Sequence, residues 1–307
     1  MSDQTGRVVL VTGCSSGIGR ATAVYLAQRG WRVYASARRL DDISGLQTEQ
    51  LVPLVLDVTD EDARKRAVDQ IAKQAGRLDA LVNNAGTNIG GPLELVSLDD
   101  AREQFEINVW GALRLIQLVV PIMRQQGGGR VVNITSVMGK YSLPYSGLYS
   151  ASKYALEALS DTLRWELSPW NIQVCIIEPG SIESNIGSKA RVFRQRFSDD
   201  PRYARYLGAN GKVRTAAVHQ GNRLFGLVQA VGRALVDKQP QGVARVIEQA
   251  LTDEHPRARY KSGLDAHVYL LMRWLMPDRL YDYAVRRFYG FRPIAPEGTG
   301  GADSNHE

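Results

Sequence analysis

The chain has 307 residues, of which 44% are hydrophobic and 23% charged, an ordinary composition for a globular protein with a large core. Its two cysteines, Cys14 and Cys175, provide neither a disulfide framework nor the spacing of a metal site, and no stretch approaches the roughly 20 apolar residues of a spanning helix. The net charge of +6 equals the basic excess within residues 186–214, which we interpret as a solvated helical face rather than a site for nucleic acid or anionic lipid. Without a recognisable secretory signal, we expect a soluble cytoplasmic protein that needs no metal.

Short apolar runs alternate with helical patterns through the first 180 residues. The apolar runs predict strands at 7–12, 31–37, 51–56, 78–82, 129–135 and 172–177. Apolar residues at helical spacing predict helices at 18–29, 61–74, 99–125 and 148–167. Strands that are apolar throughout indicate a parallel sheet that is buried on both faces. The expected fold class is therefore α/β, a doubly wound parallel sheet with helices on both faces, which binds ligands beyond the carboxyl ends of its strands.

The pattern loosens after residue 180. We expect one domain over residues 1–262, in which the long basic segment at about 181–242 forms a lid, a helix spans 243–251 and a last strand begins at 259–260. An amphipathic extension over 263–295 is split by Pro277. Packing on the body of the protein is the preferred interpretation of this extension, and a subunit interface or a membrane surface are the alternatives. The Gly-, Ser- and acid-rich tail, 296–307, is predicted to be disordered.

A glycine-rich loop, Gly13-Cys14-Ser15-Ser16-Gly17-Ile18-Gly19, joins the first predicted strand to the first helix. Glycines there let the backbone approach a pyrophosphate, which rests on the amide groups at the helix N-terminus. Taken alone, the loop is equally compatible with a tight turn that allows close packing of the helix.

The end of the second predicted strand carries Arg38 and Arg39, and no acid precedes Asp41. In dinucleotide-binding folds an acid at this place binds the ribose 2′-hydroxyl of NAD, whereas arginine accommodates the 2′-phosphate of NADP. Guanidinium suits phosphate because it is planar, always charged and able to donate two parallel hydrogen bonds. We therefore expect NADP(H), with NAD(H) as the alternative if Asp41 or Asp42 reaches the ribose.

Tyr149 and Lys153 stand four residues apart on a predicted helix, so their side chains lie on one face. A phenol with a pKa of about 10 is a poor proton donor or acceptor at neutral pH. A neighbouring ammonium favours phenolate, so Lys153 is expected to lower the pKa of Tyr149. Most isolated pairs of this kind are surface pairs, and this one gains meaning only from the other motifs.

Several motifs occur together in a fixed order: the glycine loop, Asn83-Asn84-Ala85-Gly86 after the fourth strand, Ser136 after the fifth, Tyr149 with Lys153, and Pro179-Gly180 after the sixth. In this order the chain resembles the short-chain dehydrogenase/reductase family over residues 6–185, and less closely to about 262. The resemblance implies a Rossmann-type fold, a nicotinamide cofactor and assembly as a homodimer or homotetramer.

The resemblance also implies roles for the catalytic positions. Tyr149 would donate a proton to the carbonyl oxygen in reduction and accept it in oxidation. Lys153 would bind the nicotinamide ribose, Ser136 would hydrogen-bond the substrate oxygen, and Asn108 would hold a water that relays protons to Lys153.

Further positions are implied to contact the cofactor. Asp57 and Val58 would lie at the adenine, and Asn84, Ala85 and Gly86 would line the adenosine ribose. After the sixth strand, Ile182 and Ser184 match positions that hold the carboxamide, although the family usually has threonine at the latter. The implied cofactor site, with Tyr149 and Lys153 included, comprises Gly13, Ser15, Ser16, Gly17, Ile18, Gly19, Arg38, Arg39, Asp57, Val58, Asn84, Ala85, Gly86, Pro179, Gly180, Ile182 and Ser184.

The segment that follows the fifth strand contributes Met138, Leu143 and Tyr145 beside Ser136 and Tyr149, and its apolar side chains suit a hydrophobic alcohol or carbonyl compound. The layout looks most like the hydroxysteroid and retinol dehydrogenase branch. The leading hypothesis is an NADP(H)-dependent oxidoreductase that interconverts a hydrophobic alcohol and its ketone or aldehyde. The alternatives are a catalytically silent NADP(H)-binding regulator and, from the basic segment, a nucleic-acid binder, for which no reader motif is present.

Overall fold

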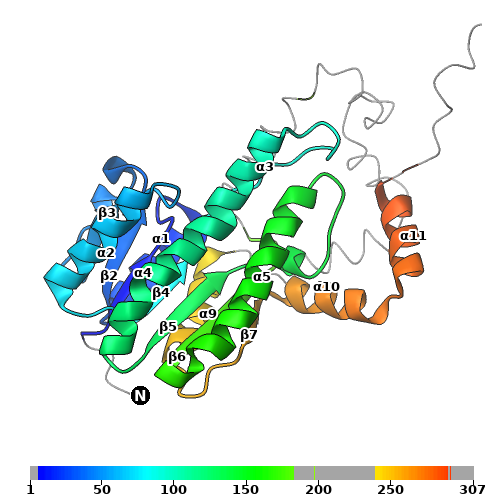
Figure 1. Ribbon diagram of the computed structural model, residues 1–307. Helices are drawn as coiled ribbons and strands as arrows, with labels where there is room; N and C mark the ends of the chain where they lie inside the picture. The colour runs from blue at the N-terminus through cyan, green and yellow to red at the C-terminus, as the bar shows by residue number, and fades with distance from the viewer. Residues whose placement is uncertain (1–5, 183–196, 198–238, 290, 292–307) are drawn as a thin grey trace, which may run out of the picture.

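The computed structural model describes residues 6–182, 197, 239–289 and 291 (Figure 1). The chain forms a seven-stranded parallel sheet in the order β3-β2-β1-β4-β5-β6-β7. The strands are β1 (Val8–Val11), β2 (Arg32–Ala37), β3 (Leu51–Val55), β4 (Ala80–Asn83), β5 (Gly129–Ile134), β6 (Ile172–Pro179) and β7 (Arg259–Ser262). This doubly wound α/β sheet confirms the predicted fold class, because the strand order reverses direction between β1 and β4.

Helices cover both faces of the sheet (Figure 1). On one face lie α1 (Gly17–Gln28) and α9 (Pro240–Thr252), and on the other lie α2 (Glu61–Ala75), α4 (Gly111–Gln125) and α5 (Gly147–Leu167). In β1, Val9 and Val11 belong to the first core, whereas Val8 and Leu10 belong to the second. A strand with apolar residues on both sides can only be buried on both faces, which is why its sequence shows no alternation.

One helical segment runs without a break over Leu98–Gln125, through α3 (Leu98–Phe105), the π-helical turn η3 (Glu106–Trp110) and α4. By length and composition it could cross a membrane, and no other helix in the described part of the chain could. The expectation that no stretch reaches this length was wrong, because Arg114 is the only charge between residues 107 and 123. In the fold this helix packs on the sheet, with Leu115, Val119 and Met123 fully buried.

Two helices follow the last strand, α10 (Leu264–Leu275) and α11 (Asp278–Tyr289). They lie beside the end of α5 that begins the helix (Figure 1). Inner residues of these helices pack with Val137 and Tyr141 in a small third core. Most of the expected lid, 181–242, and the whole of the tail, 296–307, lie outside the described residues.

Candidate active site

Two cavities lie at the carboxyl ends of the strands, where the fold class predicts ligand binding. One is polar and has a volume of about 510 Å³, and the other is largely apolar and has a volume of about 550 Å³. Ile18, Asn84 and Gly86 line both cavities, so the two adjoin one another. Both volumes are of the size that holds a cofactor or a small ligand.

The glycine loop forms one wall of the polar cavity, with Gly13, Ser15, Ser16, Gly17 and Ile18 along it. Gly13 has a φ of 73°, and a Cβ there would lie 2.9 Å from Ala85 Cα. A Cβ on Gly19 would overlap Gly13 O, so this glycine serves the packing of α1 and does not line the cavity. These two glycines therefore let the loop pack closely against Asn84 and Ala85, at the place where a pyrophosphate would rest on the start of α1.

Arg38, at the end of β2, lines the same cavity, whereas Arg39, Asp41 and Asp42 do not. The structure gives the Arg38 guanidinium no hydrogen bond or ion pair with another described residue. Asp41 and Asp42 form the exposed 3₁₀ turn η1 (Leu40–Asp42) beyond it. Of the two candidate arginines, the structure thus brings Arg38 to the site and leaves Arg39 outside.

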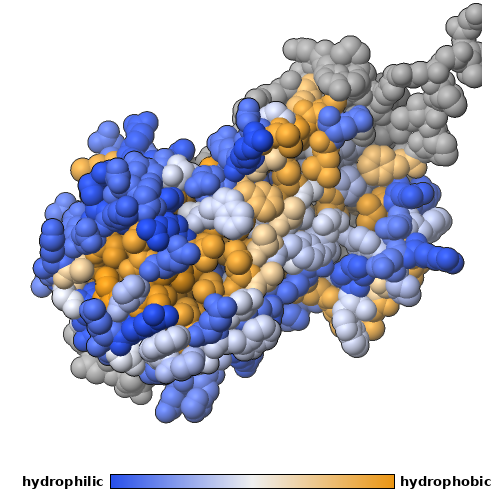
Figure 2. Space-filling model, in the orientation of Figure 1, coloured by the Kyte–Doolittle hydropathy of each residue, from blue (hydrophilic) through white to orange (hydrophobic). Residues whose placement is uncertain are grey.

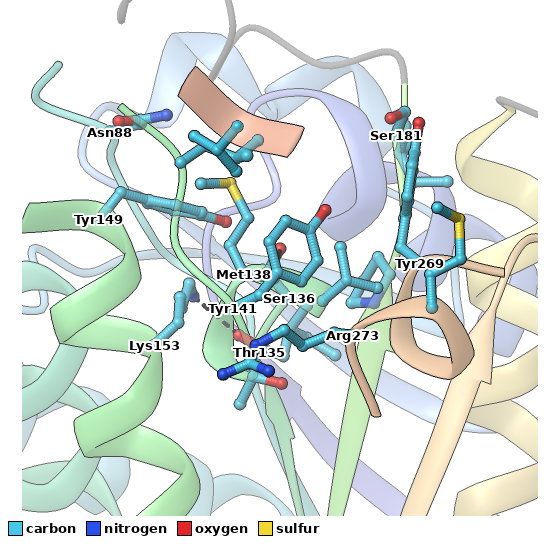
Figure 3. Close-up of a pocket in the computed structure, with 18 of the residues that line it drawn as sticks. Asn88, Thr135, Ser136, Met138, Tyr141, Tyr149, Lys153, Ser181, Tyr269 and Arg273 are labelled. Atoms are coloured by element: carbon cyan, nitrogen blue, oxygen red, sulfur yellow. Dashed lines mark hydrogen bonds between the residues drawn. The ribbon is translucent and has the colours of Figure 1, made fainter. Parts of the chain in front are cut away.

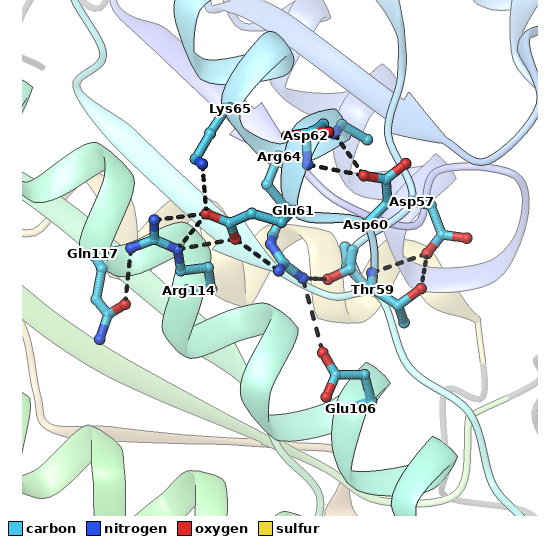
Figure 4. A network of polar contacts seen from close by, with 12 residues as sticks. Asp57, Thr59, Asp60, Glu61, Asp62, Arg64, Lys65, Glu106, Arg114 and Gln117 are labelled. Atoms are coloured by element: carbon cyan, nitrogen blue, oxygen red, sulfur yellow. Dashed lines mark hydrogen bonds and ion pairs between the residues drawn. The ribbon is translucent and has the colours of Figure 1, made fainter.

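A wall of the polar cavity adjoins a network of polar contacts that links the segment after β3 with α2, η3 and α4 (Figure 4). Asp57 Oδ1 accepts hydrogen bonds from the Thr59 backbone N–H at 2.9 Å and from the Thr59 hydroxyl at 2.8 Å. Arg64, on α2, donates to the carbonyl oxygen of Val58. The network thereby fixes Asp57 and Val58, the residues predicted to lie at the adenine, at the cavity wall.

Asn84 is anchored to β1 rather than left free. Its Nδ2 donates to Thr12 O at 2.8 Å, and the Thr12 hydroxyl accepts from the backbone N–H groups of Asn84 and Ala85, both at 2.9 Å. These bonds tie the carboxyl ends of β1 and β4 together beneath the glycine loop. Ala85, Gly86 and Thr87 follow along the cavity wall, and Thr87 was not foreseen from the sequence.

Ser136, Tyr149 and Lys153 meet in the apolar cavity (Figure 3). Ser136 caps the turn η4 (Val137–Gly139) directly after β5, where its Oγ accepts a hydrogen bond from the Met138 backbone N–H at 3.1 Å. Tyr149 and Lys153 project from the first turns of α5. Lys153 Nζ donates to Ile134 O at 2.9 Å and lies 5.7 Å from the centre of the Tyr149 ring.

The pKa of Tyr149 is raised above its usual value by burial, and the hydrogen bond with Ser136 partly opposes this. The expectation that Lys153 lowers the pKa of Tyr149 is thus not met, because the ammonium donates to Ile134 O instead of to the phenol oxygen. Burial also lowers the pKa of Lys153 to about 8, while the carboxylate of Glu157 acts to raise it. The pKa of each of these two groups therefore differs from that of the free side chain.

Asn108 lies in the π-helical turn η3 and is almost fully buried. Its Oδ1 accepts from the Thr87 backbone N–H at 2.8 Å, and its Nδ2 donates to Thr87 O and to Ser152 Oγ, both at 3.0 Å. A Cβ on Gly86 would lie 3.4 Å from Asn108 Oδ1 and 3.9 Å from Lys153 Nζ. The three residues therefore converge on one small space beside the cavity, and π-turns of this kind are frequent at functional sites.

The apolar cavity is built from two distant parts of the chain. Met138 and Leu143 line it as predicted, together with Tyr141. Tyr145 does not line it, because its ring packs against Tyr289 and Phe291, with 6.2 Å between ring centroids in both pairs. The opposite wall was missed in the sequence and comes from α10, α11 and the turn between them, through Tyr269, Met272, Arg273, Met276, Tyr281, Ala284, Val285, Phe288 and Tyr289.

Pro179, Gly180 and Ile182 line the cavity where β6 ends, and Ser184 lies outside the described residues. Asp265, at the start of α10, explains the glycine, because a Cβ on Gly180 would overlap its carboxylate. Asp265 Oδ2 also accepts a hydrogen bond from the Ser181 backbone N–H at 2.7 Å. This contact holds the cavity wall formed by α10 against the end of β6.

Comparison with known proteins agrees with this geometry. The family model for short chain dehydrogenases matches residues 7–194, which is more than half of the chain. The chain is 32% identical over 287 residues to a 3-ketodihydrosphingosine reductase from Bacteroides thetaiotaomicron, covering 93% of this chain and 99% of that protein. It is 35% identical over 286 residues to retinol dehydrogenase 5 from Homo sapiens, covering 89% and 86%.

Solved structures give the same result. A short-chain dehydrogenase from Streptomyces avermitilis superposes with a TM-score of 0.70 at 31% identity, covering 91% of this chain and 96% of that one. A gluconate 5-dehydrogenase from Burkholderia cenocepacia in complex with NADP and tartrate superposes with a TM-score of 0.58 at 29% identity, covering 64% and 80%. From its glycine loop to its paired cavities, the chain is therefore an oxidoreductase that belongs to the short-chain dehydrogenase/reductase family, with retinol dehydrogenases among its relatives.

Proposed function

We propose that the chain interconverts a hydrophobic alcohol and its ketone or aldehyde with NADP(H), and that Tyr149 is the general acid and base. One observation carries the proposal: Tyr149 lies with Ser136 and Lys153 in an apolar cavity that adjoins the polar cavity of the glycine loop. A proton donor is thus available beside the place where a cofactor and an apolar substrate would meet.

The residues of the polar cavity fit a dinucleotide, because the glycine loop at the start of α1 and the Arg38 guanidinium line the same cavity. When bound, the nicotinamide supplies or accepts the hydride. In reduction the phenol of Tyr149 donates its proton to the carbonyl oxygen, and the Ser136 hydroxyl donates a hydrogen bond to the same oxygen. Lys153 holds the nicotinamide ribose, and Asn108, beside Gly86, places the water that returns protons to Lys153.

The preference for NADP(H) rests on Arg38, which lines the polar cavity with no acid beside it at the end of β2. The preference for a hydrophobic substrate rests on the walls of the second cavity, where Met138, Leu143 and the inner faces of α10 and α11 leave few polar groups. Two of the relatives are named for 3-ketodihydrosphingosine and for retinol, which is consistent with such a substrate.

The proposal is tested by following NADPH oxidation in the presence of a panel of steroid, retinoid, long-chain aliphatic and aromatic carbonyl compounds. We expect turnover with at least one apolar member of this panel, and little turnover when sugars or small acids are assayed in its place. Tight NADPH binding without turnover on any carbonyl compound would contradict the proposal and favour the silent regulatory protein.

A further inference from the structure

A pair of buried carboxylates lies beneath the catalytic residues, and the proposed mechanism does not use them. Glu157, on α5, has a side chain that is only 4% exposed, and Glu178, on β6, has one that is 2% exposed. Lys140 Nζ lies 2.7 Å from Glu157 Oε2 and 4.0 Å from Glu178 Oε1. Arg259 Nε lies 3.1 Å from Glu157 Oε2 and 3.6 Å from Glu178 Oε1. Burying acids costs free energy unless they are paired, so two cations hold this cluster together.

Glu157 also touches the part of the chain that carries Ser136. The hydroxyl of Thr135, the residue before Ser136, donates to Glu157 Oε1 at 2.7 Å. A Cβ on Gly139, in the turn that Ser136 caps, would lie 3.1 Å from Glu157 Cγ. The side chain of Glu157 therefore contacts the segment that carries Ser136 on both sides of that residue, through its carboxylate at Thr135 and its Cγ at Gly139.

Glu157 stands four residues after Lys153, so the two side chains lie on one face of α5. Lys153 is buried, and burial disfavours its charged form and lowers its pKa to about 8. The carboxylate of Glu157 is the charge that opposes this effect. The protonation of Lys153 near neutral pH thus depends on the charge that Glu157 carries.

The charged groups around Glu157 come from every element packed on it. They are Lys153 and Asp161 of α5, Lys140 after η4, Glu178 of β6, and Arg259 and Lys261 of β7. Burial and the neighbouring Glu157 raise the pKa of Glu178. Its Oε1 has no hydrogen-bond partner among the described residues, whereas both oxygens of Glu157 are bonded. Glu157 is therefore the more fully bonded member of the pair.

We propose that Glu157 is a positioning residue of the reaction, whose carboxylate, held by Lys140 and Arg259, keeps the Lys153 ammonium charged for cofactor binding and fixes the segment that carries Ser136. The inference rests on the proposed function, because it takes Lys153 as the residue that binds the nicotinamide ribose. The inference implies that the pH dependence of NADPH binding is set by the buried cluster around Glu157 and not by Lys153 alone.

The test compares Glu157→Gln with the wild type in the pH dependence of the Kd for NADPH, measured by fluorescence titration. Glutamine still accepts the hydrogen bond from Thr135 but carries no charge. We expect NADPH binding to weaken above about pH 8 in the wild type and to weaken about one pH unit lower in the variant. Asp161→Asn is the matched control, since Asp161 also bonds Arg259, at 2.5 Å, and lies one turn further from Lys153. The Asp161→Asn variant should leave the pH dependence of the Kd for NADPH unchanged.

A second variant is expected to shift the pH profile of NADPH binding in the opposite direction. Lys140 is 34% exposed, so Lys140→Met should fold even if Glu157→Gln does not. Removing this cation leaves Glu157 less neutralised, and the loss of NADPH binding should therefore move to higher pH. Profiles that stay in place in both variants, or that move in the same direction, would overturn the inference. Because NADPH binding is measured directly, these results stand apart from the carbonyl panel, which tests the proposed reaction.

Discussion

At the scale of single residues, Tyr149 is a phenol whose burial favours the protonated form. That state suits a proton donor in reduction. The simple picture drawn from the sequence, in which a nearby ammonium makes the phenol more acidic, omits the desolvation that accompanies burial. Burial of both Tyr149 and Lys153 follows from tertiary packing and is not visible in the spacing of the two residues.

Arg38 provides a prediction at the same scale. Arg38→Asp should lower the preference for NADPH over NADH, measured as the ratio of the two Kd values, by about tenfold or more, because a charge-assisted hydrogen bond to phosphate is replaced by repulsion. Arg39→Asp is the control, since Arg39 stands next in the chain but does not line the polar cavity. An unchanged ratio in Arg38→Asp, or an equal fall in the two variants, would refute the assignment of the phosphate site to Arg38.

At the scale of elements, Glu61 joins α2 to α4 (Figure 4). Its carboxylate bonds Arg114 of α4 at 2.7 Å, Arg64 at 2.8 Å and Lys65 at 3.3 Å. The hydrogen bonds from Arg114 and Arg64 hold the pKa of Glu61 well below its usual range. Because the folded pKa is lowered, the stability from this group is present above the unfolded pKa and is lost as pH falls through the folded pKa.

Glu61→Gln is therefore expected to lower the Tm at neutral pH. The difference in Tm between the variant and the wild type should become smaller in acid and at high salt. Thermal unfolding followed by circular dichroism measures this. Asp99→Asn is the control, because Asp99 pairs with Arg102 at an exposed position on α3 and has no other ion pair among the described residues. A gap that does not change between neutral pH and acid would show that the carboxylate charge contributes nothing.

The sequence predicted the elements of residues 7–180 well, because apolar runs and helical spacing are local signals. The strand ends moved by one or two residues: the fourth runs to Asn83 and the sixth to Pro179. The wall formed by α10 and α11 could not be predicted, because an amphipathic pattern shows that a face is covered and not what covers it. The prediction that Tyr145 lines the apolar cavity was wrong for a related reason. An aromatic side chain suits that cavity and the aromatic cluster with Tyr289 and Phe291 equally well.

At the scale of the whole molecule, hydrophobic residues gather over α4 on the face shown in Figure 2. Leu118 and Ile122 are only partly buried there. The neighbouring α5 exposes Tyr154 and Trp165, which lie eleven residues apart and so share one face of the helix. Trp165 is 68% exposed. An apolar surface of this kind is suited to a second copy of the chain, which agrees with the homodimer or homotetramer that the family resemblance implies.

Trp165→Glu should shift the particle mass towards the monomer, since exposed tryptophans are frequent centres of an interface. Light scattering after size-exclusion chromatography measures the mass. Trp274→Glu is the control, because Trp274 is 80% exposed on α10, a different element. Dissociation by the control variant and not by Trp165→Glu would place the interface at the C-terminal helices instead.

The central claim is that Tyr149 performs the proton transfer in the apolar cavity, and one measurement tests it most directly. Tyr149→Phe removes a single oxygen from a site whose ring packing is kept, and its kcat for carbonyl reduction is compared with that of the wild type alongside the Kd for NADPH. We predict a loss of about 10²- to 10⁴-fold in kcat with NADPH binding retained. A variant that turns over at the wild-type rate would contradict the account.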